Sequence, residues 1–266
     1  LKELPFALER NEFTLHYQPI VNLEQKAASG FEALIRWKHP NRGMISPGDF
    51  LPLAERVGLV SDVGRWILNR ACADAAQWPE HMNVAVNLSS VQIANCDVSS
   101  MVKTALDQSG IDPRRLHVEI SDATFTQSID EVRDLLLKLE EMGMTITLDQ
   151  FGARLSDLNY LKDVPISRVK IDESLVHDVS VRRNGVGVLR SVAALARDLK
   201  IVSVAQGVET LSDLAIVRGA GFDEAQGFYF SVPVPAERIA FAISRCEFRF
   251  GKTTAAHRRA STAAAA

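Results

Sequence analysis

Acidic and amide side chains recur where β-prone runs of the chain end. The clearest case is "TITLDQFG" at residues 145–152, where a β-branched run ends in the carboxylate Asp149 and is followed by the neutral amide Gln150. Residues at comparable positions of other runs are Glu32, Asn87, Glu119, Lys170 and Glu209, with Gln18, Gln206 and Gln226 interleaved. Carboxylate and amide oxygens are suitable ligands for hard cations such as Mg²⁺ or Mn²⁺. The pattern therefore predicts a site for metal-assisted phosphoryl chemistry.

Each of these residues also has a simpler explanation. A single acidic residue after a strand commonly caps the next helix, and Asn87 can bond to its own loop. Lys170 can equally be a salt-bridge partner that neutralises the acidic cluster. Recurrence at successive strand ends favours one shared site, because independent caps would not need the same register. The six histidines are scattered, which argues against a zinc centre.

The elements that must position these residues alternate between short β-prone runs and longer amphipathic stretches. The predicted strands lie within 28–37, 83–90, 116–122, 145–152, 167–175, 201–210 and 222–230. The predicted helical stretches are 49–78, 98–108, 128–142, 186–199, 211–218 and 236–246, with a capping box at Ser128 and helix ends at Gly110 and Gly143. This order is typical of a parallel barrel or a doubly wound sheet. We favour a barrel, because no glycine-rich phosphate loop follows the first run.

The composition fits one globular domain of 1–248 followed by a low-complexity tail, 249–266, that we expect to be disordered. The net charge of −3 and the scattered basic residues argue against a nucleic-acid polymer as partner. Three widely spaced cysteines and the lack of a signal-peptide pattern or membrane-spanning run favour a cytoplasmic location for the domain. The start at Leu1 suggests a piece of a longer protein, which could itself be membrane-anchored.

Several motifs together resemble the EAL domains, bacterial phosphodiesterases that open cyclic di-GMP to linear pGpG. These motifs are "YQPI" (17–20), "FEALIRW" (31–37), "SPGDFLPLAE" (46–55), "VNLSS" (86–90), "VEISD" (118–122), "DQFG" (149–152), "VKID" (169–172), "AQGVET" (205–210) and "AQGFYFSVP" (225–233). The resemblance covers residues 1–245 and implies an α/β fold, a modified TIM (β/α)₈ barrel with an antiparallel first strand.

The resemblance also implies roles for individual residues. Those matching ligands of one metal are Glu32, Asn87, Glu119 and Asp149. Those matching catalytic positions around the metals and the attacking water are Lys170, Glu209, Gln206 and Gln150. Those matching nucleotide-binding positions are Gln18, Leu34, Arg36 and Gln226. Implied partners are cyclic di-GMP, a second copy of the chain in a homodimer, and an upstream GGDEF or sensory domain.

This chain departs from the family at two carboxylates. The family usually has "DDFG" and "EGVE", where this chain has Asp149-Gln150 and Gln206. A neutral amide offers a second cation little charge compensation, and glutamine cannot act as a general base. Nearby, "ARLSDL" (153–158) replaces a loop of small residues, and Asp122 replaces a longer glutamate. Alternatively, Glu209 or Asp172 holds the second metal instead.

These departures favour a degenerate EAL domain that binds cyclic di-GMP as a receptor or regulatory module with little or no hydrolysis. Mg²⁺ or Mn²⁺ is expected only at the first-metal site. Two alternatives stay open: a metal-dependent phosphodiesterase that cleaves cyclic di-GMP to pGpG, and a nucleotide-independent protein-interaction domain.

Overall fold

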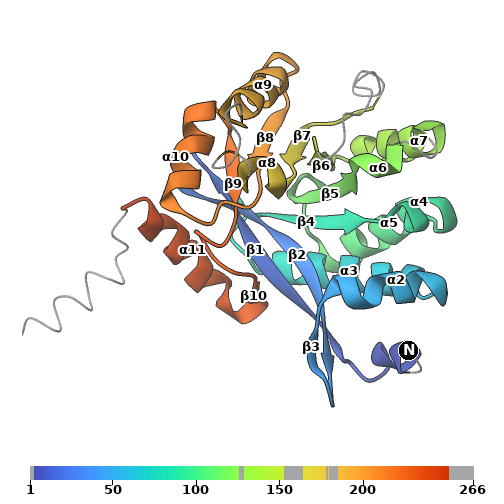
Figure 1. The fold of residues 1–266 in the computed structure, drawn as a ribbon. Helices are drawn as coiled ribbons and strands as arrows, with labels where there is room; N and C mark the ends of the chain where they lie inside the picture. Colours follow the sequence, from blue (N-terminus) through green and yellow to red (C-terminus); the bar gives the residue numbers. More distant parts are fainter. Residues whose placement is uncertain (1–2, 126–128, 153–163, 178, 180–184, 252–266) are drawn as a thin grey trace, which may run out of the picture.

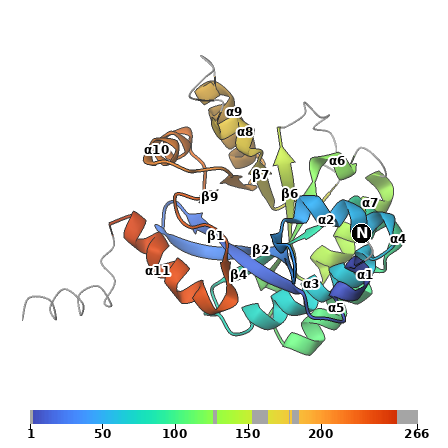
Figure 2. The same ribbon diagram turned by 60° about the horizontal axis from the view of Figure 1, so that its bottom comes forward.

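The fold is a closed barrel of strands surrounded by helices (Figures 1 and 2). The structure is a computed structural model, and it describes residues 3–125, 129–152, 164–177, 179 and 185–251. The barrel strands are β1 (Phe13–Asn22), β2 (Ala27–His39), β4 (Asn83–Leu88), β5 (Leu116–Ser121), β6 (Thr145–Phe151), β7 (Arg168–Ile171), β8 (Val202–Ala205) and β9 (Glu224–Gln226). Two short strands, β3 (Gly43–Ile45) and β10 (Val234–Pro235), extend the sheet beyond β2 and β1. The predicted α/β barrel is confirmed.

The first strand runs against the others. β1 pairs antiparallel with β2 and with β9. The remaining neighbours around the barrel, in the order β2, β4, β5, β6, β7, β8 and β9, pair in parallel. In the register, Gln18 lies opposite Glu32 and Ile20 lies opposite Gln226. The predicted antiparallel first strand is therefore correct, although 13–22 was not among the β-prone runs predicted from periodicity.

The helices lie on the outside of the barrel (Figure 2). They are α1 (Leu4–Ala7), α2 (Pro47–Arg56), α3 (Val60–Ala75), α4 (Ser90–Asn95), α5 (Val98–Ser109), α6 (Asp122–Phe125), α7 (Ile129–Glu141), α8 (Glu173–His177), α9 (Gly185–Asp198), α10 (Leu211–Ala220) and α11 (Ile239–Arg249). The predicted stretch 49–78 is two helices, because Gly58 breaks it with a left-handed φ of 77°. Gly110 caps α5 as predicted, with a φ of 68°. The proposed cap Ser128 and the tail from 252 onward lie outside the described residues.

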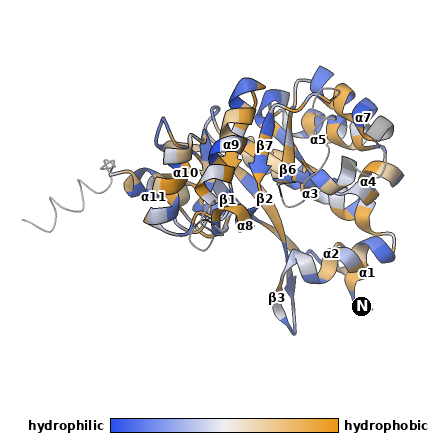
Figure 3. Cartoon of the chain, turned by 45° about the horizontal axis from the view of Figure 1, so that its top comes forward, coloured by the Kyte–Doolittle hydropathy of each residue, from blue (hydrophilic) through white to orange (hydrophobic). Residues whose placement is uncertain are grey.

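Two kinds of packing fill the structure. The main core joins outward-facing strand residues to the inner faces of the helices, and Figure 3 shows hydrophobic and hydrophilic residues alternating along those elements. A separate cluster of Ile20, Ala85 and Val204 is also buried. These three residues come from β1, β4 and β8, which are not neighbours in the sheet, so the cluster fills the barrel interior.

A buried ion pair closes the amino-terminal end of the parallel strands. Arg168 and Glu224 begin β7 and β9, and their side chains pair there. Ser29 Oγ donates a hydrogen bond to Glu224 Oε1 at 2.8 Å. This end of the barrel is thus stabilised by internal polar contacts, which leaves the carboxyl ends of the strands for the functional site.

A buried tyrosine links the barrel to its helical layer. The Tyr17 hydroxyl donates to Asp74 Oδ2 on α3 at 2.6 Å, and burial together with Asp74 raises the pKa of Tyr17. A hydrogen bond to a charged group stabilises a protein by roughly 1.5–3 kcal/mol, so we expect Tyr17→Phe to lower the free energy of unfolding by about 2 kcal/mol. Urea denaturation measures this change. The same exchange at Tyr229, whose ring packs under Arg249, is the matched control, and equal losses in both variants would contradict the prediction.

Candidate functional site

Four of the predicted site residues meet inside the barrel at the carboxyl ends of the strands. Asn87 and Glu119 are direct register partners on β4 and β5. Glu32 and Lys170 come from β2 and β7. In a barrel, alternate residues of each strand point inward, so residues from distant parts of the sequence share this interior.

Lys170 is the centre of the resulting network. Its Nζ donates to Glu119 Oε2 at 2.6 Å and to Glu32 Oε2 at 2.9 Å, and the Lys170 side chain is fully buried. Asn87 Nδ2 donates to Glu32 Oε1 at 2.8 Å rather than to its own loop. Gln226 Nε2 donates to Glu32 Oε2 at 2.7 Å and to Gln18 Oε1 at 3.1 Å. Lys170 is therefore the salt-bridge partner of the acidic cluster, one of the two roles considered for it.

The carboxylates of this network differ in their affinity for a proton. Burial raises the pKa of Glu119 to about 8 despite Lys170, and the charges of Glu32 and Asp149 add to this increase. Burial also disfavours the charged form of Glu32, but Lys170 and the amides of Gln226 and Asn87 outweigh it and hold its pKa below the usual value. The pKa of Lys170 is raised: burial opposes its charge, but the neighbouring carboxylates more than compensate. The cluster contains more carboxylates than ammonium groups and so attracts further positive charge.

Asp149 lies beside this network and is held by Gln206. Gln206 Nε2 donates to Asp149 Oδ1 at 3.2 Å, across 57 residues of sequence. Asp149 is 7% exposed, and burial, reinforced by the charge of Glu32, raises the pKa of its carboxyl group above the usual range. The residue at the predicted base position thus acts here as a hydrogen-bond donor.

Gln150 is placed differently from Gln206. It is exposed and adopts a left-handed backbone with φ of 58°, at the point where the β6–β7 register shifts. The backbone of Gln150 has a small lowering effect on the pKa of Asp149, which burial outweighs. Left-handed φ is uncommon for residues other than Gly, Asn and Asp, so glutamine is a costly choice at this position.

A pocket of about 320 Å³ opens above the network. Its lining comprises Gln18, Glu32, Leu34, Arg36, Glu173, Gln206, Gly207, Glu209, Gln226, Gly227, Phe228 and Pro233. All four predicted nucleotide-binding residues are among them. Of the two amides that replace family carboxylates, Gln206 is one of the described residues that line the pocket and Gln150 is not. The lining mixes polar and apolar side chains, and Arg36 is a suitable partner for an anionic oxygen there.

Five lining residues were not among the site residues predicted from the sequence: Glu173, Gly207, Gly227, Phe228 and Pro233. Phe228 exposes 53% of its surface. Its position in the run "QGF" (226–228), directly after Gln226, was the sequence feature that could have predicted it. Gly227 is required by close backbone packing, because a Cβ there would come within 2.1 Å of the Val208 carbonyl oxygen. Val208 N–H donates to the Gln226 carbonyl at 3.1 Å, which fixes the loop that carries Gln206 and Glu209 against the loop that follows β9.

The two alternative carboxylates differ in their surroundings. Glu209 is exposed at the mouth of the pocket. Asp172 Oδ1 accepts the Ser174 N–H at 2.9 Å at the start of α8, which is the role of a helix cap. The charge of Asp172 also contributes to the raised pKa of Asp149, so Asp172 stays an alternative ligand for a second metal.

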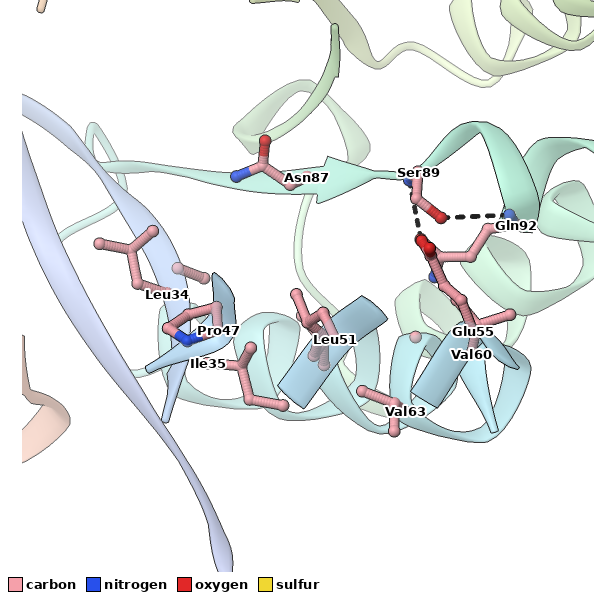
Figure 4. A pocket seen from close by; sticks show the side chains of 13 residues that line it. Leu34, Ile35, Pro47, Leu51, Glu55, Val60, Val63, Asn87, Ser89 and Gln92 are labelled. Carbon is pink, nitrogen blue, oxygen red and sulfur yellow. Dashed lines mark hydrogen bonds between the residues drawn. The ribbon is translucent and has the colours of Figure 1, made fainter. Parts of the chain in front are cut away.

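A second, apolar pocket of about 170 Å³ adjoins the first and shares Leu34 with it (Figure 4). It lies among β2, α2, α3 and the start of α4, and Leu51, Val63 and Asn87 are in its lining. At its far side, Ser89 and Gln92 form a capping box that fixes the start of α4. The polar site is thus bordered on this side by an apolar surface.

The ligand atoms offered by the first-metal residues are of the type that one hard cation prefers. Glu32, Asn87, Glu119 and Asp149 supply oxygen atoms, and Thr147 Oγ1 and Gln226 Oε1 are buried nearby without hydrogen-bond partners among the described residues. As the side chains lie, Lys170 bridges two of the carboxylates. No group of three or more His, Cys, Asp or Glu side chains in the described ranges is arranged to hold a metal ion. Beside Asp149, Gln206 presents an N–H group, which does not fit a second cation.

The barrel, its antiparallel first strand and this arrangement of polar residues define an EAL-type domain. The family model "EAL domain" matches residues 1–233, and the chain belongs to this family. No helix within the described residues is long and apolar enough to cross a membrane.

Particular relatives include two proteins of Pseudomonas aeruginosa. The bifunctional diguanylate cyclase/cyclic di-GMP phosphodiesterase MucR is 36% identical over 92% of this chain and 36% of its own length. The cyclic di-GMP phosphodiesterase NbdA is 34% identical over 88% of this chain and 30% of its own length. This chain therefore spans about a third of the length of these relatives.

Solved structures agree with this assignment. The PaMucR phosphodiesterase in complex with c-di-GMP matches with a TM-score of 0.86 and 37% identity, over 90% of this chain and 98% of that chain. The FimX EAL domain of Pseudomonas aeruginosa bound to c-di-GMP matches with a TM-score of 0.82 and 27% identity, over 88% of this chain and 95% of that chain. Similar folds therefore carry bound cyclic di-GMP.

Proposed function

We propose that this EAL domain binds cyclic di-GMP as a receptor or regulatory module and hydrolyses it slowly or not at all. The observation that carries the proposal is the hydrogen bond from Gln206 to Asp149. The amide there has no basic atom to accept a proton from water and carries no charge for a second cation. The pocket residues Gln18, Leu34, Arg36 and Gln226 remain suited to a nucleotide, so binding is retained while the chemistry is weakened.

One cation is compatible with this proposal. Mg²⁺ or Mn²⁺ would be held by Glu32, Asn87, Glu119 and Asp149, and when bound it would neutralise the acidic cluster and attract a phosphate oxygen. Arg36 would bind and orient a phosphate from the other side of the pocket. Lys170 would keep Glu32 and Glu119 in place and would keep Glu32 ionised.

Calorimetric titration of cyclic di-GMP into the purified protein with Mg²⁺ tests the proposal, with product analysis of the same samples by chromatography. The expected result is saturable heat at a fixed stoichiometry with little or no pGpG. Sustained heat flow together with pGpG would contradict it and favour the metal-dependent phosphodiesterase. Absence of binding would favour the nucleotide-independent interaction domain.

A matched pair of variants connects binding to the pocket. Arg36→Ala removes the guanidinium group from the pocket lining, and Arg65→Ala removes an exposed one from α3. The affinity of the first variant for cyclic di-GMP should fall and that of the second should not. Equal affinities in both variants would place the nucleotide elsewhere.

The wider setting is also part of the proposal. Because the chain covers about a third of its relatives' length, we place it in a longer signalling protein with an upstream GGDEF or sensory domain. The domain would act in the cytoplasm, where a homodimer is the assembly suggested by the family resemblance.

A further inference from the structure

The buried carboxylate of Asp149 has a specific partner supplied by the chain. Gln206 Nε2 lies 3.2 Å from Asp149 Oδ1. A buried carboxylate needs hydrogen-bond donors or a cation at its oxygens. The opposite orientation of the amide would bring two oxygen acceptors together, so the N–H group is the end of Gln206 that faces Asp149.

Gln150 is placed differently, although it is the residue adjacent to Asp149. Its side chain is exposed and is not part of the described pocket lining. Its backbone is left-handed, with a φ of 58°. The side chain of this residue therefore lies outside the pocket that contains Gln206.

We infer that Gln206 alone closes the position beside Asp149 to a second cation, and that the amide of Gln150 has no part in closing it. A carboxylate at position 206 would face Asp149 at hydrogen-bond distance, where two like charges require a cation or proton between them. An amide N–H satisfies Asp149 directly and offers a cation no lone pair. Gln206 is thus a positioning residue that takes the place of a metal ion. The inference deepens the proposed function, because it names what limits the chemistry of the same site.

Titration of Mn²⁺ alone into the protein, without nucleotide, tests this inference. The proteins compared are the wild type, Gln206→Glu, Gln150→Asp and the charge-matched control Gln108→Glu, which lies on an exposed position of α5. We expect Gln206→Glu to bind one Mn²⁺ more per chain than the wild type, whatever the wild type binds. Its melting temperature should rise with Mn²⁺ by more than that of the wild type. The other two variants should match the wild type in both measurements.

Equal Mn²⁺ stoichiometry in Gln206→Glu and the wild type would overturn the inference, as would an extra ion in Gln150→Asp alone. If Gln206→Glu does not fold, Gln206→Asp introduces the carboxylate with a shorter side chain and is judged by the same criterion. Because no nucleotide is present, these results are separate from the binding test of the proposed function. Failure of cyclic di-GMP to bind would reject that function and leave the metal titration unaffected.

Discussion

Replacing Lys170 with methionine is expected to lower the free energy of unfolding by about 3–5 kcal/mol, because it leaves buried carboxylates without their cationic partner. Lys170 Nζ contacts Glu119 at 2.6 Å and Glu32 at 2.9 Å, and the Lys170 side chain is fully buried. The measurement is urea denaturation with divalent cations chelated. Lys103→Met, the same exchange at an exposed position of α5, should change the free energy of unfolding by less than about 0.5 kcal/mol.

The loss in Lys170→Met should grow with pH. The pKa of Glu119 is raised in the folded state to about 8 from its ordinary value of 4.5. Between these two pH values the folded state therefore holds a proton that the unfolded state has released. Such a group stabilises the fold below pH 4.5, and this contribution is lost as the pH rises through about 8. Without Lys170 the proton is held more tightly still. A second exchange, Glu119→Gln, should restore part of the stability, and a deficit that is independent of pH and of Glu119 would contradict this account.

Gln206→Glu is expected to raise the rate of cyclic di-GMP hydrolysis by roughly 10²–10⁴-fold, the usual contribution of a general base. The exchange places an ionisable oxygen at the pocket and removes the N–H that holds Asp149. Formation of pGpG, followed by chromatography with Mg²⁺ or Mn²⁺ present, measures the gain. Adding Gln150→Asp should contribute less than Gln206→Glu, since residue 150 is exposed outside the pocket.

Two controls make the result decisive. Glu32→Ala in the Gln206→Glu background must abolish the new activity, because activity that survives loss of this buried carboxylate would come from a contaminant. If Gln206→Glu and Gln150→Asp together give no gain in hydrolysis, we would attribute the low activity to the altered segment 153–158, which lies outside the described residues.

The fold was predictable because its signals are local. Buried β-branched runs alternating with amphipathic stretches indicate parallel strands and covering helices, and parallel strands gather their carboxyl ends at one face. That reasoning brought Glu32, Asn87, Glu119 and Lys170 to one site, and the structure places them within hydrogen-bond contact. The break at Gly58 was missed because the apolar periodicity continues on both sides of it.

The individual contacts were not predictable, because they join residues far apart in sequence. Asn87 had a local alternative as a loop-bonding residue, and only the register of β2 and β4 turns its amide toward Glu32. Gln150 and Gln206 are equivalent in sequence terms, as amides in place of carboxylates. The structure distinguishes them: the backbone of Gln150 has a left-handed φ, and the side chain of Gln206 donates a hydrogen bond to the buried Asp149.

The antiparallel pairing of β1 with β9 has a consequence for synthesis of the chain on the ribosome. The hairpin of β1 and β2 forms early, but β1 must wait for residues 224–226 before its other edge is paired. Until then the nascent chain carries unpaired strand edges, which invite association with other chains. Gln18 and Gln226 are 208 residues apart and meet only when β1 and β9 pair. Ribosome-bound chains stalled before residue 224 should therefore bind chaperones and not nucleotide, and cyclic di-GMP affinity would report completion of the barrel.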